Sequence, residues 1–194
     1  NFVALPGHNK VHLTWTNPTT DFVGVEIRRV AWGDYADYAG SAPSYPANPT
    51  EGTLVTQTDL AAYNDASMGS ARDIYYYASF TYDCAGNYSL ASSTARDRST
   101  SYWLGDIDPA MIGDGSIALV DLSIFAGVFG KSDPGTGWNE EADFGPTDDW
   151  SRFGVPLPDN VVDFEDLMIF AMNYLNVSPS GTSGGLIALT EALP

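Results

Sequence analysis

The sequence is poor in basic residues and in cysteine. Its 194 residues include eight lysines and arginines against 25 aspartates and glutamates, which gives a formal charge of −17 at pH 7. A chain this acidic repels the phosphates of nucleic acids, so we exclude a nucleic-acid binder. The single cysteine, Cys84, excludes an internal disulfide framework. Because the sequence has no run of about 18 apolar residues, we expect no segment that spans a membrane.

The sequence also lacks the signals of a complete chain and of an enzyme. It starts inside a strand-like pattern, without an initiator Met or a leader with a basic start and an apolar core, so we interpret it as a piece of a larger protein. No serine or cysteine has a motif typical of a nucleophile. We therefore expect no catalytic activity in these residues, although a catalytic domain could be attached to them in the full-length protein.

The acidic residues are distributed unevenly. Residues 1–100 carry ten acidic and six basic residues, whereas residues 101–194 carry 15 acidic and two basic residues. The aspartates of the second half occur in clusters, and clustered carboxylates without basic partners commonly bind cations. The alternative is an acidic, solvated surface. Aromatic residues at 13% and hydrophobic residues at 44% are enough to form packed cores.

Residues 1–100 show the pattern of an all-β sandwich. Short alternating runs cover Lys10–Thr16 and Phe22–Val30, and an aromatic run covers Asp73–Asp83. Turn residues separate these runs, and none has the length or period of a helix.

These residues resemble a fibronectin type III domain. The resemblance rests on the opening FVALPGHNKVHLTWTNP and on the later YYYASFTYDCAGNYS. It implies that Trp15 lies in the core and that Tyr75 or Tyr77 braces a loop with its hydroxyl group.

Aromatic residues also gather in the irregular stretch that follows the second of these runs. Trp32, Tyr35, Tyr38 and Tyr45 could form a platform on which a sugar stacks, which would make the sandwich a carbohydrate-binding module. Alternatively, these side chains cover the edge of the sandwich.

The second half contains an internal duplication. DGSIALVDLSIFAGVFG, residues 114–130, aligns without gaps to DNVVDFEDLMIFAMNYL, residues 159–175, at an offset of 45 residues. Each copy also has an acidic start upstream, at Asp106 and Asp108 in the first copy and at Asp143 in the second. An internal repeat indicates one structural unit built twice.

The spacing of the acids in each copy predicts a calcium loop. Calcium takes six to eight oxygen ligands at roughly 2.3–2.6 Å, from a short curved loop that needs Gly or Asn where the chain turns with positive φ. A carboxylate on the first turn of the following helix closes such a loop. We expect two calcium ions, the second less well supported, with side-chain or backbone ligands from Asp106, Asp108, Asp114, Ser116 and Asp121 and from Asp143, Asp148, Asp159, Val161 and Asp166.

A short helix is expected after each loop. Leu122, Phe125 and Phe129 have helical spacing in the first copy, and Leu167, Phe170 and Tyr174 have it in the second. Because each helix is too short to be stable alone, we expect the two to pack together, with metal binding contributing to folding.

The segment at 104–177 resembles a dockerin, a family in which two calcium-loop and helix units, called F-hands, bind a cohesin domain. The DG…DL and DN…DL patterns carry this resemblance. Its second ligand position falls on Gly145 in the second copy, where Asp148 or Asp149 from the inserted residues, a backbone carbonyl or a water could substitute. The resemblance implies that the residues just before each closing aspartate contact the partner, namely Leu119, Val120, Phe164 and Glu165. They replace the Ser-Thr pair that cellulosomal dockerins often carry.

The sequence thus predicts a multidomain protein, with an all-β sandwich at 1–100, a small all-α dockerin-like domain at 104–177, and at 178–194 a linker and the start of a further segment. The function that we expect is calcium-dependent docking of a secreted or surface-bound bacterial protein, with a cohesin-like domain as the partner. The alternatives are carbohydrate binding by the sandwich and a purely structural spacer.

Overall fold

The computed structural model describes residues 1–107 and 113–176, and it places seven strands in the first hundred residues. The strands are β1 (Phe2–Gly7), β2 (Lys10–Trp15), β3 (Gly24–Ala31), β4 (Thr53–Thr58), β5 (Ala62–Asp65), β6 (Ile74–Tyr82) and β7 (Arg96–Thr100). They form one sheet in the order β1-β2-β5 and a second in the order β4-β3-β6-β7, and all neighbouring strands are antiparallel.

The inward-facing residues of both sheets form one core. Val11 and Leu13 of β2 are buried against Val25 and Ile27 of β3, and Trp15 stacks on Phe2 at a centroid distance of 6.0 Å. The alternation of apolar and polar residues along β2 explains this arrangement, because alternate side chains of a strand point to the same face.

A buried tyrosine braces the end of β5. Of the two candidates on β6, Tyr77 donates its hydroxyl hydrogen to the Asp65 carboxylate at 3.0 Å. Arg29 of β3 also pairs with Asp65. Tyr75 instead lies under the guanidinium group of Arg29, whose Cζ atom is 4.8 Å from the centroid of the Tyr75 ring.

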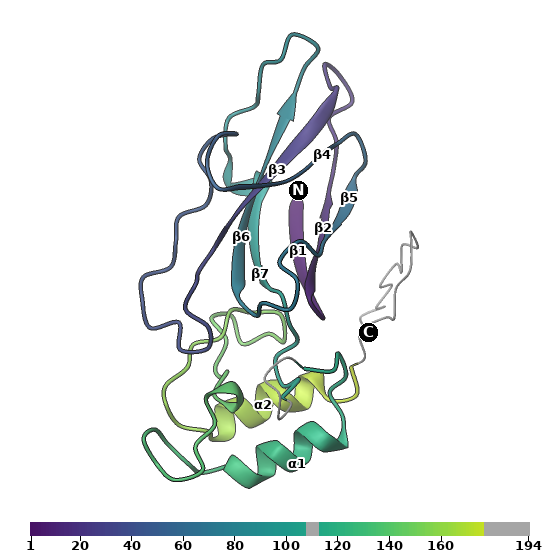
Figure 1. The fold of residues 1–194 in the computed structure, drawn as a ribbon. Helices are drawn as coiled ribbons and strands as arrows, with labels where there is room; N and C mark the ends of the chain where they lie inside the picture. Colours follow the sequence, from purple (N-terminus) through teal and green to yellow (C-terminus); the bar gives the residue numbers. More distant parts are fainter. Residues whose placement is uncertain (108–112, 177–194) are drawn as a thin grey trace.

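The second half contains two helices of ten residues each, α1 (Leu119–Val128) and α2 (Phe164–Asn173). They lie side by side beyond one end of the two sheets (Figure 1). Phe125 of α1 stacks on Phe170 of α2 at a centroid distance of 5.0 Å. These two residues are equivalent in the duplicated sequence, so the helices meet at matching positions. Single turns of 3-10 helix occur at Ser93–Ala95 and Glu140–Ala142.

Only part of the apolar face expected on each helix is buried. Phe125 and Phe170 are buried, but Phe129 and Tyr174 follow the last helical residue and are 46% and 36% exposed. Val128 and Ile169 take part in the core instead.

The fold class that we expected, a multidomain chain in which a sandwich precedes a separate all-α domain, is wrong. The described residues form a mostly-β protein with two sheets and two short helices, and no distinct all-α domain is evident in them. The physical reason is that loops, rather than helices, make up most of the second half, and that they pack on the end of the sandwich. Val155 of these loops shares a core cluster with Ile74 and Tyr76 of β6. Tyr35 packs against this cluster and against the second cluster, which contains the buried residues of the helices.

Two further expectations concern membrane segments and the chain end. In the described residues, neither helix is long and apolar enough to cross a membrane. Residues 178–194, where we expect a linker and the start of a further segment, lie outside the described residues, as does Asp108.

Candidate metal centre

In the first acidic loop, the carboxylates of Asp106 and Asp114 accept hydrogen bonds from backbone N–H groups of the loop. Asp106, at its start, accepts the backbone N–H groups of Asp114 and Gly115, each at 3.1 Å. Asp114 in turn accepts the N–H group of Ser116 at 2.8 Å. Gly115 has a φ of 81°, so the turn uses the left-handed conformation that glycine adopts without strain.

The closing aspartate of this loop lies in the first turn of α1. The carboxylate of Asp121 accepts the N–H group of Ala118 at 2.8 Å, at the start of the helix, and that of Ile107 at 2.8 Å. The second bond ties the helix back to the beginning of the loop. Backbone N–H groups without intrahelical partners and the positive end of the helix dipole both favour a carboxylate here.

The second loop repeats this pattern with the equivalent residues. An opening carboxylate accepts two N–H groups at the turn, and a closing carboxylate reaches back to the loop start and to the residue before the helix. The opening carboxylate, Asp143, accepts the N–H groups of Asp159 at 3.3 Å and Asn160 at 2.7 Å. The closing carboxylate, Asp166, accepts the N–H groups of Phe144 at 2.8 Å, Gly145 at 2.6 Å and Asp163 at 2.8 Å. Asn160, with a φ of 69°, takes the place of Gly115.

Each loop is also joined to the end of the other copy's helix. Ile117 donates its N–H to Asn176 and accepts from Leu175, at 2.9 Å and 2.8 Å, just after α2. Val162 makes the equivalent pair of bonds with Lys131 and Gly130, at 2.9 Å and 2.7 Å, just after α1. The duplicated sequences therefore fold into two equivalent units that brace each other.

Burial leaves the second loop with uncompensated acids. Asp143 and Asp166 are only 4% and 1% exposed. Burial raises the pKa of Asp143 to about 7 and that of Asp166 to about 6. In the described residues neither carboxylate forms an ion pair with a basic side chain. A buried carboxylate without a counter-charge is costly, and a cation would relieve that cost.

The first loop has the same acids but different neighbours. Burial raises the pKa of Asp106, and the nearby Arg72 guanidinium opposes that change. Arg72 Nη2 donates to the Asp106 carbonyl oxygen at 2.6 Å and lies 3.6 Å from Oδ2 of the carboxylate. His8 Nδ1, in the β1–β2 turn, also lies 3.6 Å from that oxygen. The sandwich therefore supplies the positive charge of Arg72 to the first loop.

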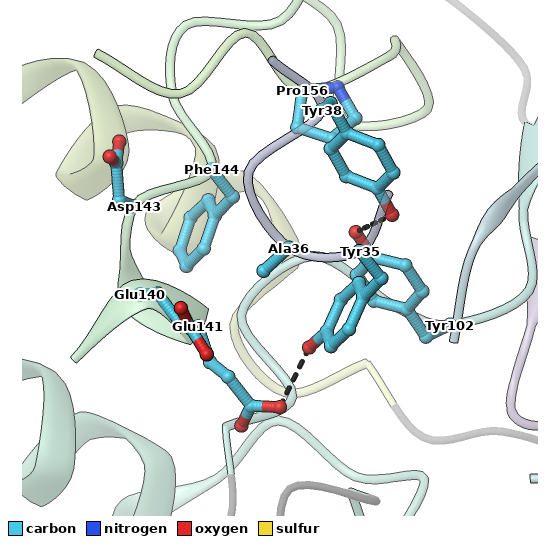
Figure 2. Close-up of a pocket in the computed structure, with 9 residues that line it drawn as sticks. All are labelled: Tyr35, Ala36, Tyr38, Tyr102, Glu140, Glu141, Asp143, Phe144 and Pro156. Atoms are coloured by element: carbon cyan, nitrogen blue, oxygen red, sulfur yellow. Dashed lines mark hydrogen bonds between the residues drawn. The ribbon is translucent and has the colours of Figure 1, made fainter. Parts of the chain in front are cut away.

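Arg72 also reaches the segment before the second loop. Its Nη1 atom donates to the Tyr35 hydroxyl oxygen at 3.3 Å and lies 3.7 Å from Glu141 Oε1. Tyr35 donates its own hydroxyl hydrogen to Glu141 at 2.7 Å, and Tyr38 and Tyr102 share a hydroxyl bond of 3.0 Å beside it (Figure 2). One buried arginine thus joins the sandwich to both copies of the repeat.

The described residues contain no group of three or more His, Cys, Asp or Glu side chains spaced to hold a metal ion, so calcium ligation by the two loops stays a prediction. The donors are all oxygens, as calcium prefers, and the acids of each loop act electrostatically on one another. The described residues that would supply ligands are Asp106, Asp114, Asp121 and the Ser116 carbonyl in one loop, and Asp143, Asp159, Asp166 and the Val161 carbonyl in the other.

Asp148, which we expected to substitute at the second ligand position, is engaged elsewhere. Its carboxylate pairs with Arg98 of β7 and accepts the Val155 N–H group at 2.8 Å. The residues inserted in the second loop therefore attach it to the sandwich. We no longer assign Asp148 to the metal.

The residues expected to contact a partner lie at the starts of the two helices. Leu119, Val120 and Phe164 are 71%, 61% and 65% exposed, whereas Glu165 is partly buried. Sequence reasoning missed Met168 and Met172, both 40% exposed. They follow Phe164 at intervals of four residues along α2, and this helical spacing was the signal that could have revealed them.

The loop aromatics do not form an open platform. Tyr38 is buried, and Tyr35, Tyr45 and Trp32 are partly buried. Their rings contact one another or the strands, as in the edge contacts of Tyr35 with Tyr102 at 5.2 Å and of Tyr45 with Tyr76 at 5.1 Å. Most of this aromatic surface covers the end of the sandwich.

Comparison of the chain with protein-family models, with curated proteins and with solved structures gave no match.

Proposed function

We propose that this chain is a non-catalytic docking protein whose second half is stabilised by two calcium ions. The observation that carries the proposal is the duplicated loop, in which buried acids are fixed by backbone N–H groups at equivalent positions. Carboxylates held in this way serve the loop structure, and a divalent cation supplies the positive charge that the second loop needs.

The surface that we propose for docking is the apolar face at the helix starts and along α2. It is formed by Leu119 and Val120 of α1 and by Phe164, Met168 and Met172 of α2. Each of these apolar side chains is exposed, and exposed apolar surface on the two helices favours a protein partner. The dockerin resemblance supports a cohesin-type domain as that partner, and the sandwich would act as a support. Calcium loops of this kind fill readily at extracellular calcium concentrations, which supports a secreted or surface location.

Binding to a panel of purified cohesin-type domains tests the docking proposal. We expect at least one domain to bind in millimolar calcium and to lose binding when the calcium is chelated. Changing Met168 to Asp should weaken that binding by at least about tenfold, because a charge would be buried in the contact. Leu90→Asp is the matched control, since Leu90 is 90% exposed in the β6–β7 connection. Failure of every domain to bind, or equal effects of the two variants, would reject docking through α2.

A further inference from the structure

A cleft lies beside the second acidic loop, between the connection that follows β3 and the residues that lead to the turn of that loop. Its volume is about 370 Å³, which is within the range of roughly 300–1,000 Å³ found for small-molecule sites. One side is lined by Trp32, Asp37, Tyr38 and Ala39, and the other by Pro156, Leu157, Pro158 and Asn160.

The indole ring of Trp32 is held firmly at this cleft. Its backbone N–H donates to Ile74 of β6 at 2.9 Å, which extends the sheet past the end of β3. Its ring lies 5.3 Å from that of Tyr38 and 6.1 Å from that of Tyr76, in tilted contacts. The ring is only partly buried. Because the ring is already fixed, a ligand that packs on it loses little affinity to ordering the protein.

Three polar side chains of the cleft retain hydrogen-bonding capacity. Within the described part of the chain, the indole N–H of Trp32, the carboxylate of Asp37 and the side-chain amide of Asn160 have no hydrogen-bond partner. They provide donors and acceptors around an apolar floor made by Pro156 and Leu157. An apolar wall with a few convergent polar groups is the usual design of a small-molecule site.

The charge of the cleft restricts the ligand. Its lining contains the Asp37 carboxylate and no lysine, arginine or histidine, and the whole chain carries a charge of −17. Phosphates, nucleotides and acidic sugars would be repelled. A neutral carbohydrate matches the cleft, because its ring offers an apolar C–H face to the indole and its hydroxyl groups both donate and accept hydrogen bonds.

We propose that this cleft binds a neutral carbohydrate, with the ring of Trp32 as the packing surface and with the Trp32 indole N–H, Asp37 and Asn160 as hydrogen-bonding partners of its hydroxyl groups. This site differs from the four-aromatic platform considered from the sequence, because only one of those rings is needed. It also lies apart from the proposed docking face on α2.

Titration calorimetry of the whole chain with cellohexaose, xylohexaose and mannohexaose tests the proposal, with trigalacturonic acid as the charged comparison. We expect saturable binding of at least one neutral oligosaccharide and none of the acidic one. The titrations are run in calcium and in chelator. Sugar binding that persists in chelator supports the cleft even if the docking proposal fails.

Substitutions at the cleft separate a specific site from surface adsorption. Trp32→Phe keeps an aromatic ring and removes the indole N–H, and Asp37→Ala removes an exposed acceptor. Each should weaken binding by about tenfold, as the loss of a good hydrogen bond does. The control is Trp150→Phe, because Trp150 is 52% exposed and does not line the cleft. The absence of binding to all neutral probes, equal binding of the acidic probe, or unchanged affinity in both cleft variants would overturn the proposal.

Discussion

The two acidic loops share one hydrogen-bonded frame but differ in their electrostatic surroundings. In the first loop Asp106 faces Arg72 and His8 of the sandwich, whereas in the second loop Asp143 has no ion pair with a basic side chain in the described residues. The aligned repeat sequences determine the frame, because equivalent residues make equivalent bonds. The difference comes from side chains outside the repeat. Equivalent loops can therefore respond differently to the same ion.

Among the variants that test this difference between the loops, replacing Arg72 with Met should cause the largest loss of stability. The guanidinium group is 4% exposed and faces both Asp106 and Glu141. Removing one partner of a buried charge pair costs about 3–5 kcal/mol, so denaturant unfolding in chelator should show a loss of this size.

The same variant should strengthen calcium binding at the first loop, because a positive charge near Asp106 opposes the binding of a cation there. The second loop should change less, because Arg72 pairs there with Glu141 and not with Asp143. Calcium titration of the variant measures this change. Equal changes at both loops would contradict the proposed difference between them.

A smaller effect is expected from replacing the closing aspartates with alanine. Among the described residues, Asp166→Ala leaves three backbone N–H groups without their acceptor, whereas Asp121→Ala leaves two. An unsatisfied buried group costs about 1–3 kcal/mol. The two variants differ by one such group, so their stabilities should differ by about that amount, which is less than the loss expected for Arg72→Met. We therefore expect the first variant to be the less stable in urea unfolding without calcium. The reverse order would show that the two frames are not equivalent.

The dependence of stability on pH should also reveal the acids of the second loop. Burial raises the pKa of Asp143 to about 7 and that of Asp166 to about 6, above the value of about 3.9 in an unfolded chain. The folded state therefore binds more protons than the unfolded state between these values. The resulting stabilisation is complete below about pH 4 and is lost as the pH rises through 6 and 7. Thermal unfolding in chelator should show this loss, and calcium should reduce it.

The smallest effect is expected in the sandwich and serves as a reference. Tyr77→Phe removes one hydrogen bond to Asp65, which should lower stability by about 1 kcal/mol. The loss should be the same with and without calcium, because these residues do not contact the loops. A calcium-dependent loss would mean that the sandwich core is coupled to the loops more strongly than the contacts indicate.

The sequence predicted local features of the molecule well. Alternating residues located β2 and β3, an aromatic run located β6, and the repeat located both helices together with the turn positions of Gly115 and Asn160. These features depend on residues close together in the chain, where periodicity and turn chemistry decide the structure.

The sequence could not predict how the two halves meet. Arg72 has no motif around it, and nothing local indicates that its side chain lies between Asp106 and Glu141. In the same way, the pairing of Asp148 with Arg98 depends on the path of the inserted residues. We therefore expected a separate all-α domain where the structure has loops packed on the sandwich.

Calcium titration of the chelator-treated chain tests the central claim most directly. Isothermal titration calorimetry should detect two binding events, and the melting temperature should rise when calcium is restored. The variant Asp143→Asn should lose one event and keep the other. If the chain binds no calcium, and if its melting temperature is the same in chelator and in millimolar calcium, the acids of the duplicated loops do not form ion sites and the account is wrong.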